Sequence, residues 1–179
     1  MNNIDDAIAS VANYFKAHGW DKAQPVIYKA EVNKNFEKLK KQALKSQNRG
    51  NTKTYVVTDS DTNAVVGYYA IAMGSVSRDI AFSALKRNSP DPIPMVVLAR
   101  LAVDLKYQGK HVAIGLLKDC ILRSMAAMEV VGGAGILIHA LDDNAQSFYK
   151  RFGFKESSID SLVLMARISD LTESLTLET

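Results

Sequence analysis

The pattern of apolar and polar positions divides the chain into a helical first part and a later part in which strands and helices alternate. In the first part, apolar residues recur at helical spacing over Asn3–Lys16 and Lys34–Gln47. A short apolar stretch, Pro25–Tyr28, lies between them. We therefore expect two helices and an edge strand before the main sheet.

A change of period after these helices predicts a β-hairpin. Thr54–Thr58 and Ala64–Ala72 are rich in β-branched and aromatic residues, which favour strands. Asp59–Asn63, between them, contains the Asp and Asn residues that suit a turn.

The rest of the chain predicts strands that alternate with helices. Pro90–Pro94 excludes a helix, because proline lacks an amide donor and restricts the residue before it. The near-continuous apolar run Met95–Val103 predicts a strand buried on both faces. The other expected elements are a brief helix, a long amphipathic helix with Lys118, Asp119 and Arg123 on its polar side, a strand, a helix and a final strand: Phe82–Arg87, Val112–Glu129, Ile136–Ala140, Asn144–Arg151 and Ser161–Ile168.

Composition is that of an ordinary globular protein. The 179 residues are 47% hydrophobic and 23% charged, which predicts one domain, residues 1–168, followed by a polar tail, residues 169–179. The single cysteine, Cys120, excludes an intramolecular disulfide and a cysteine-rich metal site, and we expect no metal. The N-terminus lacks the positive charge of a secretory signal, and no apolar run approaches the roughly 18 residues that span a bilayer. We expect a cytoplasmic protein without a membrane segment.

The basic residues are unevenly distributed, although the formal net charge is only +3. Between Lys34 and Lys53 basic residues recur with a single acid, Glu37. This run is either a solvated helix face or a surface for a polyanion. The same two alternatives, solvated charge or a surface for a polyanion, apply to Lys86 and Arg87 beside the proline segment. Contacts to a nucleic-acid backbone are typically made by Lys and Arg.

The loop between the apolar strand and the long helix is the first candidate for chemistry. The first amides of a helix have no acceptor within the helix and, with the helix dipole, favour an anion such as phosphate. Gly109 allows a tight turn and Lys110 adds a positive charge. No Gly-x-Gly-x-x-Gly or P-loop motif is present, so the loop alone identifies no family.

Together with its neighbours Met95–Asp104 and Asn144–Phe154, the loop resembles the GNAT acyltransferase family. Motif A of that family is a strand followed by Gln/Arg-x-x-Gly-x-Gly/Ala, which resembles Gln108–Ala113 here. The resemblance implies a single α/β domain with a mixed central sheet, flanking helices and splayed central parallel strands. It also implies acetyl-coenzyme A as cosubstrate. Two sets of residues would bind it, the loop at the pyrophosphate and the strand backbone at the pantetheine arm: Gln108, Gly109, Lys110, His111, Val112 and Ala113, and Leu101, Ala102 and Val103.

His111 stands where the family has its central glycine. Glycine there lets the backbone approach the pyrophosphate without a Cβ in the way. The imidazole can block the site, or it can swing outward and donate to a phosphate when protonated. The sequence leaves both alternatives open.

A wider resemblance is to the GNAT toxins of bacterial toxin–antitoxin pairs. It is carried by these segments: Ala43–Gln47, Thr54–Val57, Gly67–Ser75, Arg87–Pro94, Leu98–Asp104, Leu116–Asp119 and Ile138–Leu141. This resemblance implies acetyl transfer to the amino group of aminoacyl-tRNA, which stops translation until a ribbon-helix-helix antitoxin binds. It also implies that Tyr149 supplies the acid for the leaving thiolate, while a plain core role for this ring stays open. Arg49 joins Lys86 and Arg87 as a candidate tRNA contact.

Two rival functions remain at this point. One is a GNAT enzyme that acetylates a small amine or a protein amino group. The other is a GNAT-fold binding module that has lost catalysis, for which His111 is the argument. The sequence does not determine the oligomeric state, and a homodimer is one alternative. His139 is expected to be a core histidine and Asp142 a helix cap.

Overall fold

The computed structural model describes residues 45–171. The chain divides into two compact units, whose described parts are residues 45–72 with 100–122 (unit 1) and residues 73–99 with 123–171 (unit 2). The helix expected at Asn3–Lys16 and the strand at Pro25–Tyr28 lie outside the described residues. Of the helix expected at Lys34–Gln47, only the end is described, and residues 45–48 are helical.

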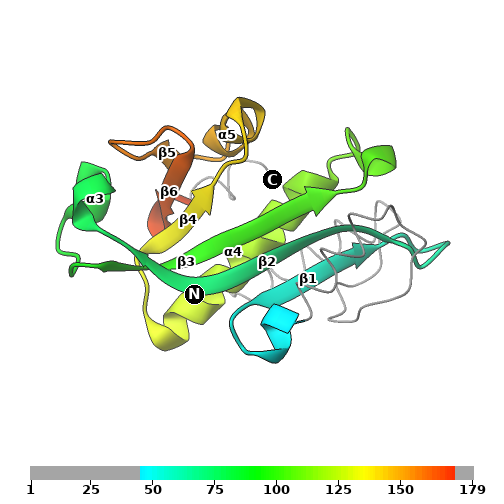
Figure 1. Cartoon of the computed structure of the whole chain (residues 1–179), viewed down its shortest axis with the longest axis horizontal. Coiled ribbons are helices and arrows are strands. Elements are labelled where there is room, and N and C mark those ends of the chain that lie inside the picture. Colours follow the sequence, from blue (N-terminus) through cyan, green and yellow to red (C-terminus); the bar gives the residue numbers. More distant parts are fainter. Residues whose placement is uncertain (1–44, 172–179) are drawn as a thin grey trace. The chain divides into compact units, whose positions relative to one another are not determined.

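Within the described residues, six strands form one mixed sheet in the order β1-β2-β3-β4-β6-β5 (Figure 1). Their bounds are Lys53–Thr58, Val65–Val76, Ile93–Val103, Gly135–His139, Lys155–Glu156 and Val163–Arg167 for β1 to β6. The helices are η1 Arg78–Ile80, α3 Ser83–Lys86, η2 Leu105–Tyr107, α4 Val112–Val131 and α5 Asp143–Lys150. β3 and β4 are parallel, whereas β1–β2, β4–β6 and β5–β6 are antiparallel. The predicted α/β class with a mixed sheet is confirmed.

Unit 1 is built on the β1–β2 hairpin and the first half of α4. Aromatic rings of the two strands stack, with the ring centroids of Tyr55 and Tyr69 5.0 Å apart. The fully buried Tyr69 hydroxyl donates to Asp119 Oδ2 on α4 at 2.5 Å. Asp119 is therefore buried, and its predicted place on the polar side of the helix is wrong. A buried carboxylate is tolerated here because the tyrosine supplies its hydrogen bond.

Unit 2 has a core between β3, β4 and β6 on one side and the segment η1–α3 on the other. The buried members of this cluster come from five elements and the chain next to them: Val76, Ala81, Leu85, Ile93, Met95, Leu137, Val163 and Met165. The parallel register pairs Met95 with Gly135 and Leu98 with Ile138. Apolar side chains from three neighbouring strands thus meet on one face of the sheet.

The carboxyl end of β3 differs from the expectation. Burial continues to Leu98, but Ala99 and Arg100 are exposed. The pairing of β3 with β4 also ends at Leu98, opposite Ile138. The predicted burial of the strand on both faces therefore does not hold along its whole length.

The chain after β6 continues as regular structure. Residues 168–171 are helical, and Leu171 is 1% exposed. Residues 172–179, the remainder of the expected polar tail, lie outside the described part of the chain.

Candidate functional site

The loop before α4 has an alternating backbone. Gly109 has φ 74° and His111 has φ 61°, whereas Lys110 between them stays at negative φ. The carbonyl of His111 accepts the first helical hydrogen bond, from the amide of Gly115 at 3.1 Å. Alternation of left- and right-handed residues turns successive N–H groups toward one side and forms a concave anion site. The start of α4 adds the unpaired amides of a helix N-terminus.

The structure leaves space around Gly109 in this loop. A Cβ built on Gly109 would meet nothing within 4 Å, and His111 is exposed to solvent. Histidine also adopts the left-handed region more readily than most side chains. The residues present therefore fit a pyrophosphate, because the backbone conformation that glycine would supply is already there.

Contacts on its strand side fix the loop at its start. The amide of Asp104, the residue after β3, donates to Val66 of β2 at 2.8 Å. The Gln108 side chain donates to the carbonyl of Val103 at 3.2 Å. The Lys110 ammonium lies 4.7 Å from the ring centroid of Tyr107. Tyr107 was not singled out from the sequence, because nothing local to it shows what its hydroxyl contacts.

The strand residues expected at the pantetheine arm are positioned by the same part of unit 1. Leu101, Ala102 and Val103 are half-buried at the end of β3. The carbonyl of Ala102 lies 3.2 Å from the position of a Cβ on Gly67 of β2, so the two backbones approach closely there. The polar groups along this strand end are main-chain groups, which suits pairing with an extended ligand.

Tyr149 belongs to unit 2, where α5 holds it in place. Its side chain is 7% exposed, and its ring makes edge contacts with Phe148 at 5.1 Å and Phe154 at 6.0 Å between centroids. Asp142 caps α5 by accepting from the amide of Ala145 at 2.8 Å, as expected.

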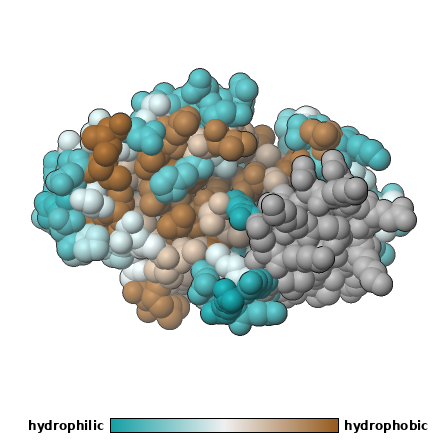
Figure 2. All heavy atoms as spheres, viewed as in Figure 1, coloured by the Kyte–Doolittle hydropathy of each residue, from teal (hydrophilic) through white to brown (hydrophobic). Residues whose placement is uncertain are grey.

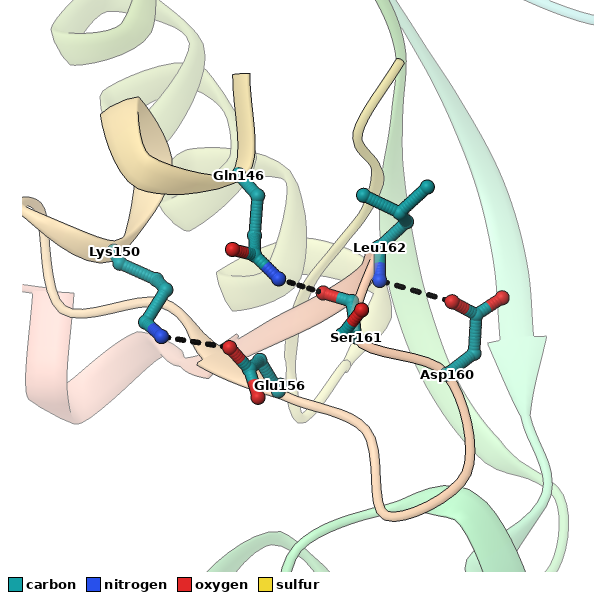
Figure 3. Close-up of polar contacts among 6 residues, drawn as sticks. All are labelled: Gln146, Lys150, Glu156, Asp160, Ser161 and Leu162. Atoms are coloured by element: carbon teal, nitrogen blue, oxygen red, sulfur yellow. Dashed lines mark hydrogen bonds and ion pairs between the residues drawn. The ribbon is translucent and has the colours of Figure 1, made fainter. Parts of the chain in front are cut away.

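Two side chains of α5 bind the chain around β5 and β6 (Figure 3). Gln146 donates to the carbonyl of Ser161 at 2.8 Å, and Lys150 pairs with Glu156 at 2.6 Å. The ion pair is exposed and contributes little. The helix that carries Tyr149 is thus fixed at one turn by a hydrogen bond to the β5–β6 segment, at its start by its cap and along its buried face by aromatic packing.

His139 is the last residue of β4 and is exposed, so its expected place in the core is wrong. It pairs with Val163 of β6, while the register of β4 with β3 has already ended at Ile138. Within unit 2, the residues that follow the last β3–β4 pair are both exposed, Ala99 on β3 and His139 on β4. The expected burial was correct for Gly135–Ile138 of β4 but does not extend to His139.

The candidate tRNA contacts are placed as follows. Arg49 is exposed in the turn after residue 48 of unit 1. In unit 2, Lys86 donates to the carbonyl of Asp79 at 3.1 Å, and Arg87 is exposed at the end of α3. Sequence reasoning missed Arg78, whose guanidinium donates to Ser89 O at 2.7 Å across the same segment. Neither contact is an ion pair, so these cations keep their charge available for an anion.

Apolar atoms also reach the surface (Figure 2). The large hydrophobic residues that are most exposed are Met73, Leu105, Val130, Val131, Leu141 and Ile159. Exposed apolar side chains of this size are typical of contacts with other proteins when they gather in a patch. Within residues 45–171, no helix is long and apolar enough to cross a membrane, and no three His, Cys, Asp or Glu residues are grouped as metal ligands.

A family model described as "Acetyltransferase (GNAT) domain" matches residues 50–156. A second model, "Transglycosylase SLT domain", matches residues 1–81. The two matches overlap at residues 50–81, which in the structure carry β1 and β2 of the six-stranded sheet. These residues are accordingly part of the acetyltransferase match.

Curated relatives point in the same direction. The chain is 42% identical over 132 residues to a "tRNA-acetylating toxin" of Mycobacterium tuberculosis (strain ATCC 25618 / H37Rv), covering 74% of this chain and 78% of that protein. It is 30% identical over 126 residues to a "Probable toxin TacT" of Sinorhizobium fredii (strain NBRC 101917 / NGR234), covering 65% of this chain and 70% of that protein.

Solved structures of similar fold include three toxin structures. A tyrosine-to-phenylalanine mutant of KacT has a TM-score of 0.72 at 21% identity, covering 84% of this chain and 91% of that one. AtaT complexed with acetyl-methionyl-tRNAfMet has 0.69 at 23%, covering 82% and 87%. An AtaT mutant bound to the C-terminus of the antitoxin AtaR and acetyl-CoA has 0.64 at 21%, covering 83% and 88%. At these identities the structures show the fold, and with the family match and the 42% identical relative the chain belongs to the acetyltransferase (GNAT) family.

Proposed function

We propose that this protein transfers acetyl from acetyl-coenzyme A to the amino group of aminoacyl-tRNA and acts as the translation-blocking toxin of a toxin–antitoxin pair. The observation that carries this function is the 42% identity with a tRNA-acetylating toxin over 74% of the chain. The solved AtaT structures, which contain an acetylated aminoacyl-tRNA in one case and acetyl-CoA in another, support the same substrates. Charged tRNA is found in the cytoplasm, where we propose that the protein acts.

Acetyl-coenzyme A would be held by two parts of unit 1. The pyrophosphate would be bound by the alternating loop and the start of α4: Gln108, Gly109, Lys110, His111, Val112 and Ala113. The backbone of Leu101, Ala102 and Val103 would pair with the pantetheine arm. The left-handed backbone at His111 supports this role, since it is the conformation that a glycine at this position would supply, and the side chain is exposed. This backbone also weighs against the alternative of a GNAT-fold binding module that has lost catalysis, for which His111 was the argument.

In the reaction, the amine nitrogen bonds to the acetyl carbon and loses one proton to solvent, the carbon–sulfur bond breaks, and the sulfur leaves with one proton, so that no net proton is consumed. We assign the delivery of the proton on sulfur to the Tyr149 hydroxyl. The Tyr149 ring packs against Phe148 and Phe154, which restricts the positions that its hydroxyl can take. A phenol suits an acid that must stay protonated at neutral pH until charge develops on sulfur.

The tRNA would be held through its backbone by Arg49, Lys86 and Arg87. Contacts to phosphates need positively charged side chains and do not depend on the nucleotide sequence. They also make binding sensitive to salt. Arg87 supports this assignment best, because it is exposed and forms no side-chain hydrogen bond or ion pair within the described residues.

For the partners, we propose a ribbon-helix-helix protein as the antitoxin and keep a homodimer as the oligomeric state to be tested. The AtaT structure with the C-terminus of AtaR supports an antitoxin that contacts the toxin through one terminal segment.

The direct test is incubation with labelled acetyl-coenzyme A and a pool of charged tRNAs, polyamines and peptides. Label should appear on the amino acid of one or more charged tRNAs and should be released with it on mild ester hydrolysis. Label on polyamines or peptides alone would favour the small-amine or protein-substrate alternative.

A further inference from the structure

The turn between β1 and β2 is organised by one carboxylate. Asp59 Oδ1 accepts three hydrogen bonds within the turn, from the amides of Asp61 and Thr62 and from the Thr62 hydroxyl, at 2.9–3.1 Å. Its other oxygen, Oδ2, is not used by the turn. It accepts instead from the hydroxyl of Tyr107, 48 residues later in the chain, at 3.1 Å.

Tyr107 links this turn to the loop before α4. It is the last residue of η2 and is followed directly by Gln108. Its ring lies under the Lys110 ammonium, 4.7 Å from the centroid. One side chain therefore contacts both the hairpin turn and the positively charged residue between Gly109 and His111.

The protonation states of the two groups favour this bond near neutral pH. Hydrogen bonds from Thr62 and Tyr107 lower the pKa of Asp59, so its carboxylate stays ionised. Partial burial and then the neighbouring Asp59 raise the pKa of Tyr107, so its hydroxyl keeps the proton that it donates. A bond from a neutral hydroxyl to an ionised carboxylate is stronger than one between two neutral groups.

We propose that Asp59 and Tyr107 are positioning residues for the cosubstrate loop: the hairpin turn holds η2 and Lys110 in the arrangement that binds the pyrophosphate. This inference rests on the proposed function, since it concerns the same acetyl-coenzyme A site. Neither residue needs to touch the cosubstrate. The hydrogen bond between Asp59 and Tyr107, here called the tether, already orders the loop before acetyl-coenzyme A binds. Binding therefore costs less conformational entropy.

Tyr107→Phe tests this directly, because it removes only the hydroxyl and keeps the ring below Lys110. The dissociation constant for acetyl-coenzyme A, measured by calorimetry, should rise roughly three- to tenfold, the factor expected for one hydrogen bond. The single-turnover rate at saturating acetyl-coenzyme A should stay near that of the wild type. In an Asp59→Ala background, Tyr107→Phe should have little further effect, because the two residues act through one bond.

Thr62→Val is the matched control. It removes a hydrogen bond to the other oxygen of the same carboxylate and leaves the contact with Tyr107 in place. Affinity for acetyl-coenzyme A should be unchanged in this variant. If Thr62→Val weakened binding as much as Tyr107→Phe, or if Tyr107→Phe bound as tightly as the wild type, the positioning role would be wrong.

Hydrogen exchange of the free protein separates this inference from the proposed function. Amides of residues 108–113 should exchange several-fold faster in Tyr107→Phe than in the wild type and in Thr62→Val, with the rest of α4 unchanged. If the wild type bound no acetyl-coenzyme A and Tyr107→Phe still exchanged faster than the wild type, the proposed function would be wrong and the tether would be supported. Equal exchange in all three proteins would remove the tether alone.

Discussion

Gly109 and His111 adopt the same left-handed backbone, with φ of 74° and 61°, two residues apart in the loop before α4. The histidine therefore reproduces the conformation for which a glycine would ordinarily be selected. Its side chain is exposed to solvent.

The first prediction follows from this geometry. His111→Gly should bind acetyl-coenzyme A as well as the wild type or slightly better, whereas His111→Val should bind at least several-fold more weakly, because a β-branched residue is strained at positive φ. Calorimetry on the two variants makes the comparison. A large loss in His111→Gly would instead identify the imidazole as a ligand of the phosphate.

The second prediction concerns the basic residues assigned to tRNA. Arg87→Gln combined with Lys86→Gln and Arg49→Gln should weaken acetylation of charged tRNA and leave acetyl-coenzyme A binding unchanged. In a plot of the logarithm of the tRNA binding constant against the logarithm of the salt concentration, the slope should become shallower by about 0.7–0.9 for each phosphate contact that is lost. The readout is the initial rate at several salt concentrations.

Arg151→Gln is a suitable control for Arg87→Gln alone, since it also removes one positive charge from an exposed residue, here one that lies 5.7 Å from the Phe148 ring. Its rate and its salt slope should match those of the wild type. Acetylation that ignores both salt and the triple substitution would move the small-amine or protein-substrate alternative ahead.

The third prediction is a pH dependence of stability. The pKa of Asp59 is lowered in the folded protein by its hydrogen bonds with Thr62 and Tyr107. A lowered pKa stabilises the fold above the ordinary pKa of an aspartate, and this contribution disappears as the pH falls through the folded value. Asp59→Asn should therefore be less stable than the wild type at pH 7, and the gap should narrow below about pH 4. Denaturant melts at both pH values give the two differences.

The fourth prediction tests the close packing of β4 against β6. A Cβ on Gly135 would lie 2.0 Å from the carbonyl oxygen of Ala166, so the backbones of β4 and β6 would have to move apart. Gly135→Ala should lower the free energy of unfolding by about 1–3 kcal/mol or more. Gly74→Ala is the milder comparison, because its new Cβ would meet a methyl group of Val97 at 2.6 Å. A Gly135→Ala melt equal to that of the wild type would contradict this packing.

The sequence predicted the elements whose burial is a local property, and it failed where burial depends on a distant partner. β4, α4 and α5 lie within two residues of their expected bounds, because their apolar spacing reflects one buried face. Asp119 was misplaced because Tyr69, 50 residues earlier, makes its burial possible. His139 was misplaced because the buried part of β4 ends at Ile138, where its pairing with the distant strand β3 also ends.

The candidate site shows the same division. The residue types and spacing of the loop predicted a helix start that suits an anion, and the structure agrees in the backbone at Gly109 and His111. The contact between Asp59 and Tyr107 could not be predicted, because it joins two turns whose separation in space depends on the whole of unit 1.

The last prediction concerns Tyr149. Tyr149→Phe removes one hydroxyl and keeps the ring that packs against Phe148 and Phe154, so folding and acetyl-coenzyme A binding should be nearly unchanged. The departing thiolate would lose its proton donor at the moment when charge develops on sulfur, and the single-turnover rate should fall by roughly a hundred- to ten-thousandfold. Cells should then tolerate expression of the variant.

Phe154→Leu provides the comparison for that experiment, because it disturbs the packing around the same ring, at a residue that is 2% exposed, and leaves the hydroxyl in place. It should lower the thermal midpoint while retaining most of the saturated rate, whereas Tyr149→Phe should do the reverse. A Tyr149→Phe protein that acetylates at the wild-type rate would assign this ring to the core alone. The proton on the thiol would then have to come from solvent or from another donor.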